Sequence, residues 1–429
     1  MKSSRVFLQQ SLQLSLSPFT FDASCSAEAR RLVIHHTLVS DTIHRQPKMP
    51  TTTSNTFAKF GVRPVINACG IYTDLGGTVF SPRVWQAMQE INQSFVRMVD
   101  LLEHSGEMIA ALVGAEAARV VPGASAAITL GTAACIAGKD GHAWEQLPDT
   151  SGLKSEVLIQ KAHRYKYDRM VRIAGGRLIE VGTPALTTAA EFEKACSART
   201  AMVMFPAHLD GRSGTLSLRE VSHITRQHGV PLLVDAAYMN YPTSIMGEYL
   251  DAGADLVCFS AKYFWGPNSG GFICGRRNLI EAVAGIDFTR YESGKYLTFG
   301  RPFKLDRHTI VATVAALEEW FAMDHDARWL SYKNKVAAMR AQLADLQDVV
   351  TAARYFTMDE RLIDEPVSCM TIELKGGPSH VERVSNELLA GDPSIATVVL
   401  DDKLVVAVDT LLDDQHLQIA ARLRQILRP

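Results

Sequence analysis

The stretch of sequence that decides the fold is Ser260-Ala261-Lys262-Tyr263-Phe264-Trp265-Gly266-Pro267-Asn268-Ser269-Gly270-Gly271. It follows the apolar run 255–259, which is typical of a buried strand, so we expect Lys262 just beyond that strand's C-terminal end. Ligands of open α/β sheets bind at this edge. The glycines and the proline indicate a turn whose backbone can approach a ligand closely. Lys262 is therefore a candidate for binding a cofactor, although most lysines after strands are solvated.

A second apolar run, 231–235, ends in the carboxylate of Asp235. Such an aspartate often does no more than cap the next helix. Together, however, a lysine and an aspartate at the ends of neighbouring strands are what pyridoxal 5'-phosphate (PLP) requires. The lysine forms a Schiff base with the aldehyde, and the carboxylate keeps the pyridine nitrogen protonated so that the ring can accept electrons. The sequence therefore predicts PLP, held by Lys262 and Asp235.

Composition limits the function classes. The chain has 429 residues, of which 47% are hydrophobic and 21% are charged, as in a soluble globular enzyme. The net charge of -2 gives no reason to expect a nucleic acid or an acidic membrane as partner. The seven cysteines never have C-x-x-C spacing, which predicts neither a zinc site nor a disulfide framework. No apolar stretch reaches the roughly 18 residues that span a bilayer, so we expect a cytoplasmic protein.

Residues 1–55 differ from the rest, being rich in serine and threonine without regular periodicity. Acidic residues count against a transit peptide, so we favour an overlong start ahead of Met49 or a disordered tail over a targeting signal. From about residue 104, strands alternate with helices such as Leu218–His228, which predicts a mostly parallel sheet. The expected strands are 118–121, Glu156–Lys161, Arg177–Val181, Ala201–Phe205, Leu232–Asp235, Leu256–Ser260 and Gly271–Cys274.

The pattern changes after a long helix expected at Asp306–Met323. The elements expected beyond it are a strand at Val367–Leu374, a helix at Ser379–Leu389, a hairpin of 396–400 and 404–408, and a last helix at Asp413–Ile426. We predict a tail (1–55), a large PLP-binding α/β domain (56–310) and a small C-terminal α+β domain (311–429). This is the layout of fold-type I PLP enzymes.

The phosphate of the cofactor needs an anion site. Gly123, Ala124 and Ser125 open an alanine-rich helix, and the N-terminus of a helix offers free amides and the positive end of its dipole. The alternative is a plain strand–helix turn with a serine cap. Ser260, beside the lysine, could supply a further hydrogen-bond donor. We predict the phosphate at this helix N-terminus.

Other predicted contacts rest on position alone. His163 follows an expected strand, and its imidazole could stack on the pyridine ring. His208 and Asp210 follow another strand and could reach the phenolic oxygen of PLP, although a polar loop is the alternative. Arginine matches a substrate carboxylate in a bidentate way, and we prefer Arg301, with Arg290 behind it. Either arginine could instead be solvated or part of an interface ion pair. No metal site is expected.

A series of motifs runs from Val65 to about Trp320. In order, they are Ile66-Asn67-Ala68-Cys69-Gly70, Leu75-Gly76-Gly77-Thr78, 112–118, 121–127, Asp235, Phe259-Ser260-Ala261-Lys262 with Gly266-Pro267, and Gly300-Arg301 ahead of Lys304 and Asp306. Together they resemble the selenocysteine synthase family of fold-type I PLP enzymes, and more closely its small-molecule branch around D-glucosaminate-6-phosphate ammonia-lyase. The resemblance implies that Lys262 is the Schiff-base lysine and Asp235 the pyridinium partner. It also implies a homodimer or larger homo-oligomer with active sites near subunit boundaries.

Two features depart from the family pattern. Selenium transferases carry an additional N-terminal helical module for tRNA, whereas residues 1–55 are neither basic nor convincingly helical. The bulky Tyr263-Phe264-Trp265 replaces the smaller residues expected after the lysine, which indicates a pocket partly lined by aromatic rings.

We therefore predict a PLP-dependent lyase, of the β-elimination or ammonia-lyase type, that acts on a small amino acid or amino sugar acid. Lys262 would remove the Cα proton, and burial with the cationic ring would lower its pKa to suit that role. The alternatives are a PLP-dependent transferase of the selenium transferase or aminotransferase type, an aldolase on the same scaffold, and a non-catalytic PLP-binding protein.

Overall fold

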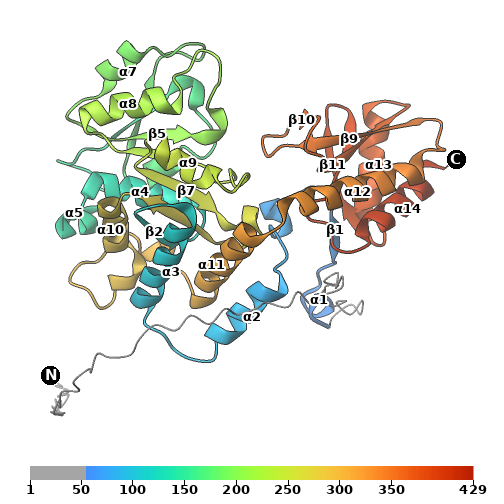
Figure 1. Ribbon diagram of the computed structural model, residues 1–429, viewed down its shortest axis with the longest axis horizontal. Coiled ribbons are helices and arrows are strands. Elements are labelled where there is room, and N and C mark those ends of the chain that lie inside the picture. The colour runs from blue at the N-terminus through green and yellow to red at the C-terminus, as the bar shows by residue number, and fades with distance from the viewer. Residues whose placement is uncertain (1–54, 429) are drawn as a thin grey trace, which may run out of the picture. The chain divides into compact units, whose positions relative to one another are not determined.

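A seven-stranded, mostly parallel sheet forms the centre of the larger part of the molecule (Figure 1). The structure is a computed structural model that describes residues 55–428. The strand order is β2-β8-β7-β6-β5-β3-β4, and β8 alone runs antiparallel to its neighbours β2 and β7. The strands are β2 (Ala117–Val121), β3 (Glu156–Gln160), β4 (Arg177–Val181), β5 (Thr200–Pro206), β6 (Leu232–Asp235), β7 (Leu256–Ser260) and β8 (Gly271–Gly275).

Helices cover both faces of this sheet. Every residue of the five inner strands β3, β5, β6, β7 and β8 is buried, and because both of their faces are covered these strands are mostly apolar. One face packs against α4 (Ala124–Ala137), α5 (Gly141–Gln146), α6 (Met170–Ile173) and α10 (Arg277–Ile286). The other face packs against α2 (Pro82–Ile91), α3 (Met98–Val113), α7 (Ala189–Ala195), α8 (Leu218–His228), α9 (Ile245–Asp251) and α11 (Arg307–Ala322). The predicted α/β class is confirmed.

A second, antiparallel sheet of order β10-β9-β11-β14-β13 lies in the C-terminal part of the chain. Its strands are β9 (Val349–Phe356), β10 (Leu362–Ile363), β11 (Cys369–Leu374), β13 (Val398–Leu400) and β14 (Lys403–Ala407). It packs against α12 (His325–Leu343), α13 (Pro378–Ala390) and α14 (Gln415–Leu427) around a separate apolar core. The domain boundaries at 55 and 310 remain predictions.

The chain passes through the C-terminal core before it reaches the large sheet. β1 (Val65–Asn67) pairs in parallel with β12 (Ser394–Ala396), and Ile66 and Ala68 are buried in the C-terminal core. Ala396 therefore belongs to this short pairing and not to the expected hairpin, whose first strand begins at Val398. Neither β9 nor α12 was predicted from the sequence.

The remaining elements are short. They are the helix α1 (Asn55–Phe60) and the 3-10 helices η1 (Thr73–Leu75), η2 (Lys161–His163), η3 (Ala207–Leu209), η4 (Ala261–Phe264), η5 (Phe288–Arg290) and η6 (Arg301–Phe303). No helix within residues 55–428 combines the length and apolar character that a membrane span requires. Residues 1–54, and with them nearly all of the predicted tail, lie outside the described part.

Candidate active site

Lys262 and Asp235 follow two adjacent parallel strands. Asp235 is the last residue of β6 and lies opposite Cys258 of β7, while Lys262 comes two residues after β7 ends. The backbone N–H of Ser260 donates to the carbonyl of Ala237 at 3.0 Å, which joins the two turns beyond the strands. The structure therefore brings the predicted lysine and carboxylate to one edge of the large sheet.

The carboxylate of Asp235 is buried among neutral groups. It accepts hydrogen bonds from the hydroxyl of Tyr165, from the backbone N–H of Ala237 at 3.1 Å and from the thiol of Cys258 at 3.6 Å. Burial raises the pKa of Asp235, and the bond from Tyr165 is the largest effect that lowers it. A buried carboxylate in such surroundings is stabilised by any cation placed beside it.

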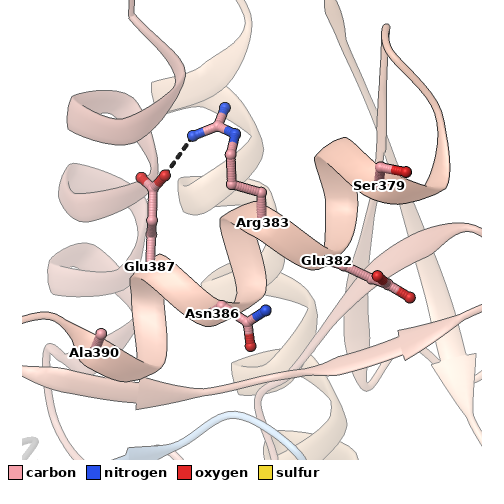
Figure 2. A pocket seen from close by; sticks show the side chains of 6 residues that line it. All are labelled: Ser379, Glu382, Arg383, Asn386, Glu387 and Ala390. Atoms are coloured by element: carbon pink, nitrogen blue, oxygen red, sulfur yellow. Dashed lines mark hydrogen bonds and ion pairs between the residues drawn. The ribbon is translucent and has the colours of Figure 1, made fainter.

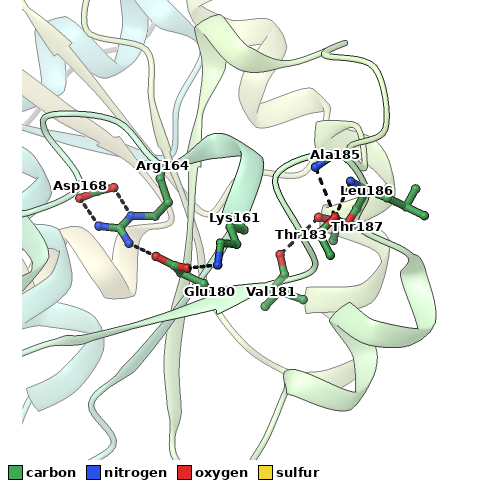
Figure 3. Close-up of polar contacts among 9 residues, drawn as sticks. All are labelled: Lys161, Arg164, Asp168, Glu180, Val181, Thr183, Ala185, Leu186 and Thr187. Atoms are coloured by element: carbon green, nitrogen blue, oxygen red, sulfur yellow. Dashed lines mark hydrogen bonds and ion pairs between the residues drawn. The ribbon is translucent and has the colours of Figure 1, made fainter.

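Polar contacts stabilise the loop beyond β3 that carries Tyr165, and Figure 3 shows those that Arg164 makes with Asp168 and Glu180. The backbone N–H of Tyr165 donates to the carboxylate of Asp168 at 3.1 Å. Arg164 binds both Asp168 and Glu180, which ties this loop to β4. Asp168 is itself buried. Contacts that lie outside the site thus hold Tyr165 beside Asp235.

Lys262 is half-buried and donates a hydrogen bond to the hydroxyl of Thr73 at 2.7 Å. Its Nζ also lies 4.9 Å from the centre of the Tyr263 ring. Burial lowers the pKa of Lys262, the nearby charge of Lys166 lowers it further, and Asp74 opposes both. A larger fraction of the amine is therefore uncharged near neutral pH than in a solvated lysine.

The segment 71–78 is packed against the turn that carries the lysine. The hydroxyl of Thr78 donates to the carbonyl of Gly266 at 3.1 Å. Gly77 has a φ of 81°, and a Cβ at this position would come within 3.0 Å of Asn268. The two glycines of the Leu75–Thr78 motif thus allow the segment to lie close to the turn, where it presents Thr73 to Lys262.

The predicted phosphate loop touches the same turn. Gly123 precedes α4 with a φ of 84°, a backbone conformation that favours glycine. A Cβ on Gly271 would lie 2.8 Å from the Cα of Gly123, so the two strand ends approach as only glycine permits. The first amides of α4, including those of Ala124 and Ser125, have no acceptor inside the helix. They are available to an anion at the edge that holds Lys262.

The two predicted histidines lie in different surroundings. The ring of His208 is 5.3 Å from that of Tyr165 and 5.7 Å from that of Tyr238. His163 is fully buried, and its ring packs edge-on against Phe205 at 5.0 Å. Tyr165, rather than His163, is therefore the aromatic residue in contact with Asp235.

Three further predicted residues contact groups outside this cluster. Asp210 is exposed and accepts the backbone N–H of Leu218 at 3.1 Å, at the start of α8. Arg301 pairs with Glu292 at 2.8 Å, and its guanidinium carbon lies 5.7 Å from the centre of the Tyr291 ring. Arg290 is exposed in the same loop. The structure does not place these three side chains in contact with Lys262 or Asp235 within residues 55–428.

Several residues of the cluster were missed from sequence. They are Thr73, Tyr165, Lys166 and Tyr238, which approach Lys262, Asp235 or His208. Tyr165 and Lys166 come two and three residues after His163, and Tyr238 comes three residues after Asp235. Their nearness in sequence to the predicted residues was the available signal. Thr73 has no such signal, because it reaches the lysine from a distant segment.

The hollow of Figure 2 is a different feature. It is lined by α13 alone, through Ser379, Glu382, Arg383, Asn386, Glu387 and Ala390. Arg383 and Glu387 form an ion pair across one turn of the helix. The hollow includes none of the residues around Lys262. No cluster of three or more metal-ligating side chains occurs in the described range, 55–428.

Comparison with known proteins places these features in a family. The model of the SelA family, L-seryl-tRNA selenium transferase, matches residues 65–352. A 5'-C-glycyluridine monooxygenase-decarboxylase from Streptomyces sp is 30% identical, over 79% of this chain and 83% of the relative. A D-glucosaminate-6-phosphate ammonia lyase from Salmonella typhimurium is 28% identical, over 87% and 98%.

Solved structures show the same resemblance. A D-glucosaminate-6-phosphate ammonia-lyase superposes with a TM-score of 0.75 at 25% identity, over 87% of this chain and 98% of that chain. The fold alone is shared with a serine palmitoyltransferase from S. paucimobilis with bound PLP, at a TM-score of 0.50 and 14% identity, over 84% and 87%. The predicted fold-type I architecture is confirmed. The chain is an enzyme of the SelA, L-seryl-tRNA selenium transferase, family.

Proposed function

We propose that this protein is a PLP-dependent lyase that acts on a small amino acid or amino sugar acid. The observation that carries the proposal is the placement of Lys262 and Asp235 beyond adjacent strands of the large sheet. The resemblance to D-glucosaminate-6-phosphate ammonia lyase, along nearly the whole of that relative, supports the lyase class.

The residues present fit PLP. Asp235 is a buried carboxylate whose hydrogen-bond partners are all neutral, so a protonated pyridine nitrogen would supply the missing cation. Lys262 would hold the aldehyde carbon covalently. The amides of Gly123, Ala124 and Ser125 would receive the phosphate, with Ser260 as a further donor. When bound, PLP serves as an electron sink for the carbanion that forms at Cα.

The protein's own groups would move the protons. The lowered pKa of Lys262 favours an uncharged amine that can remove the Cα proton once the substrate amine has displaced it. Thr73 would orient that amine through the hydrogen bond it already accepts. Loss of the β-substituent and hydrolysis would then release a keto acid and ammonia.

The remaining assignments are part of the same proposal. His208 lies beside Tyr165 and Tyr238 and could reach the phenolic oxygen of PLP, whereas Asp210 would have to leave Leu218 to do so. His163 would stack on the pyridine ring as predicted, and Tyr165, whose hydroxyl donates to Asp235, would lie beside the same ring. Arg301 or Arg290 could bind the substrate carboxylate across a subunit boundary, in a homodimer or larger homo-oligomer.

Two other reactions are supported by relatives. The 30% identical monooxygenase-decarboxylase favours an oxygen-dependent loss of carbon dioxide as the second candidate function. The family model favours selenium transfer to a seryl-tRNA, for which the net charge of -2 offers little long-range attraction.

One panel of assays separates the three reactions. Purified enzyme is incubated with D- and L-β-substituted amino acids and amino sugar acids, and keto acid, ammonia, carbon dioxide and oxygen uptake are measured together, beside a salt titration of tRNA binding. We expect equal amounts of keto acid and ammonia without oxygen uptake. Oxygen uptake with carbon dioxide would support the monooxygenase-decarboxylase. Tight, salt-sensitive tRNA binding without turnover of any free substrate would support selenium transfer and contradict the proposal.

A further inference from the structure

A group of buried polar atoms without partners lies near the start of α12. Nine buried side-chain atoms of the described residues have no hydrogen-bond partner, and five of them belong to this group. They are Nδ1 of His325, Nε and Nη2 of Arg328, Nε1 of Trp329 and Oδ1 of Asp409. A buried donor without an acceptor costs about 1–3 kcal/mol, so such a concentration calls for a ligand or water.

Aromatic rings surround Arg328. Its guanidinium carbon lies 4.4 Å from the ring centre of Trp329, 4.5 Å from Trp320, 5.2 Å from Tyr241 and 5.8 Å from Tyr332. Ring faces stabilise the cation but take up none of its in-plane N–H bonds. The two unpartnered nitrogens, Nε and Nη2, lie on one edge of the guanidinium. That edge is the fork that matches a planar oxyanion in a bidentate way.

The charges around the fork favour an anion. Arg328 and the half-buried Lys335, whose Nζ donates to the carbonyl of Leu411 at 2.7 Å, are the cations of the cluster. Asp409 is the opposing acid, and burial raises its pKa to about 6. It therefore carries a proton part of the time near neutral pH, and a protonated carboxyl group can itself donate to an anion. The indole N–H of Trp329 is a further donor.

The cluster is connected to the turn that holds Lys262. Asn240 donates to the backbone carbonyl of Tyr263, and its own carbonyl accepts the indole N–H of Trp320 at 2.9 Å. The ring of Trp320 then packs on Arg328 and lies 5.7 Å from the ring of Trp265. An occupant of the cluster would thus be separated from the Lys262 site by a layer of aromatic rings.

We propose that Arg328 and Trp329 form a binding site for the carboxylate of a small organic acid, separate from the Lys262–Asp235 site. The fork of Arg328 takes both oxygens, and the indole N–H of Trp329 donates to one of them. The site stands on the described contacts alone and does not depend on which reaction the enzyme catalyses.

Tryptophan fluorescence tests the site, because Trp320 and Trp329 both lie against Arg328. Acetate is titrated into the purified holoenzyme at constant ionic strength, with chloride as the balancing ion and inorganic phosphate as a parallel arm. We expect a saturable fluorescence change with acetate. Arg328→Lys keeps the charge but loses the fork, and should weaken acetate binding at least tenfold. Arg340→Lys, at an exposed position of the same helix, should leave it unchanged.

A second variant keeps the test decisive if Arg328→Lys does not fold. Trp329→Phe retains a ring beside Arg328 but lacks the N–H, and should weaken acetate binding several-fold, measured as a smaller acetate-dependent rise in melting temperature. No saturable response of the wild type to acetate would mean that the cluster holds only water and would overturn the proposal. Saturation by phosphate but not by acetate, or unchanged acetate affinity in both variants, would overturn it equally.

Discussion

Lys262 and Arg328 are both partly buried cations, but their surroundings stabilise them in different ways. Lys262 has a hydrogen-bond acceptor in Thr73, and the neighbouring Asp235 has three donors. Arg328 has four aromatic rings around it but unpartnered Nε and Nη2 atoms. The loops that follow strand ends provide backbone amides and side chains that can form hydrogen bonds with buried polar groups. Aromatic rings offer only their faces. In our proposals, the first cluster holds a cofactor covalently and the second binds an anion.

The largest effect is expected from Asp235→Asn. The amide cannot balance a protonated pyridine nitrogen, so turnover should fall about 1000-fold, within the range seen when a single preorganised electrostatic contact is removed. PLP content should change little because Lys262 still holds the cofactor. Steady-state kinetics together with PLP content after release by alkali would check both statements. Turnover within threefold of wild type would show that Asp235 is not the pyridinium partner.

Asp409→Asn should change the thermal stability of the protein in a pH-dependent way, because Asp409 is the buried acid of the Arg328 cluster. Because burial raises the folded-state pKa of Asp409 from 3.8 to about 6, ionisation penalises the fold increasingly as pH rises from 3.8 to 6. Above pH 6 the loss in the free energy of unfolding stays constant, at no more than ~3 kcal/mol. The variant should therefore melt at a higher temperature than wild type near pH 8, with little difference near pH 4.

Thermal melts at both pH values provide the measurement for Asp409→Asn. Asp414→Asn, at an exposed position nearby, serves as the control and should shift neither melt. An equal gain at both pH values would mean that the effect of Asp409→Asn comes from packing and not from its charge.

Tyr165→Phe should have the smallest effect, about tenfold on kcat with KM little changed. The hydroxyl of Tyr165 donates to Asp235 and lowers its pKa, so its loss favours protonation of that carboxylate. A hydrogen bond to a charged group is worth about 1.5–3 kcal/mol. The pH profile of kcat should shift upward, since Asp235 must ionise to hold the ring cationic. Tyr167→Phe, in the exposed neighbour, should leave the profile where it is.

Most of the large sheet could be predicted from sequence because its strands are continuous apolar runs with helices between them. Leu232–Asp235, Leu256–Ser260 and Leu218–His228 coincide with β6, β7 and α8. β9 was missed because it is only partly buried and lacks a clear alternation, as its pattern of intermediate exposure shows. The pairing of β1 with β12 could not be predicted, since it joins segments from opposite ends of the chain.

The two clusters were unequally visible in the sequence. Lys262 and Asp235 each end an apolar run, so a local pattern marks them. The Arg328 cluster draws on Tyr241, Trp320, Trp329 and Asp409, which come from four separate segments and share no spacing. Position alone also led to His163, which is buried and whose stacking on the pyridine ring stays a prediction, while the contact of the nearby Tyr165 with Asp235 was not predicted. Which side chains come together in such clusters is decided by contacts between segments that are distant in the sequence.

The visible absorbance spectrum tests the central claim most directly. The purified protein should be yellow, with the visible band of PLP linked to a lysine. Lys262→Ala should lose this band while still binding PLP loosely, and Lys295→Ala, at an exposed lysine, should keep it. An unchanged spectrum in Lys262→Ala would contradict the assignment of Lys262 as the residue that holds the cofactor.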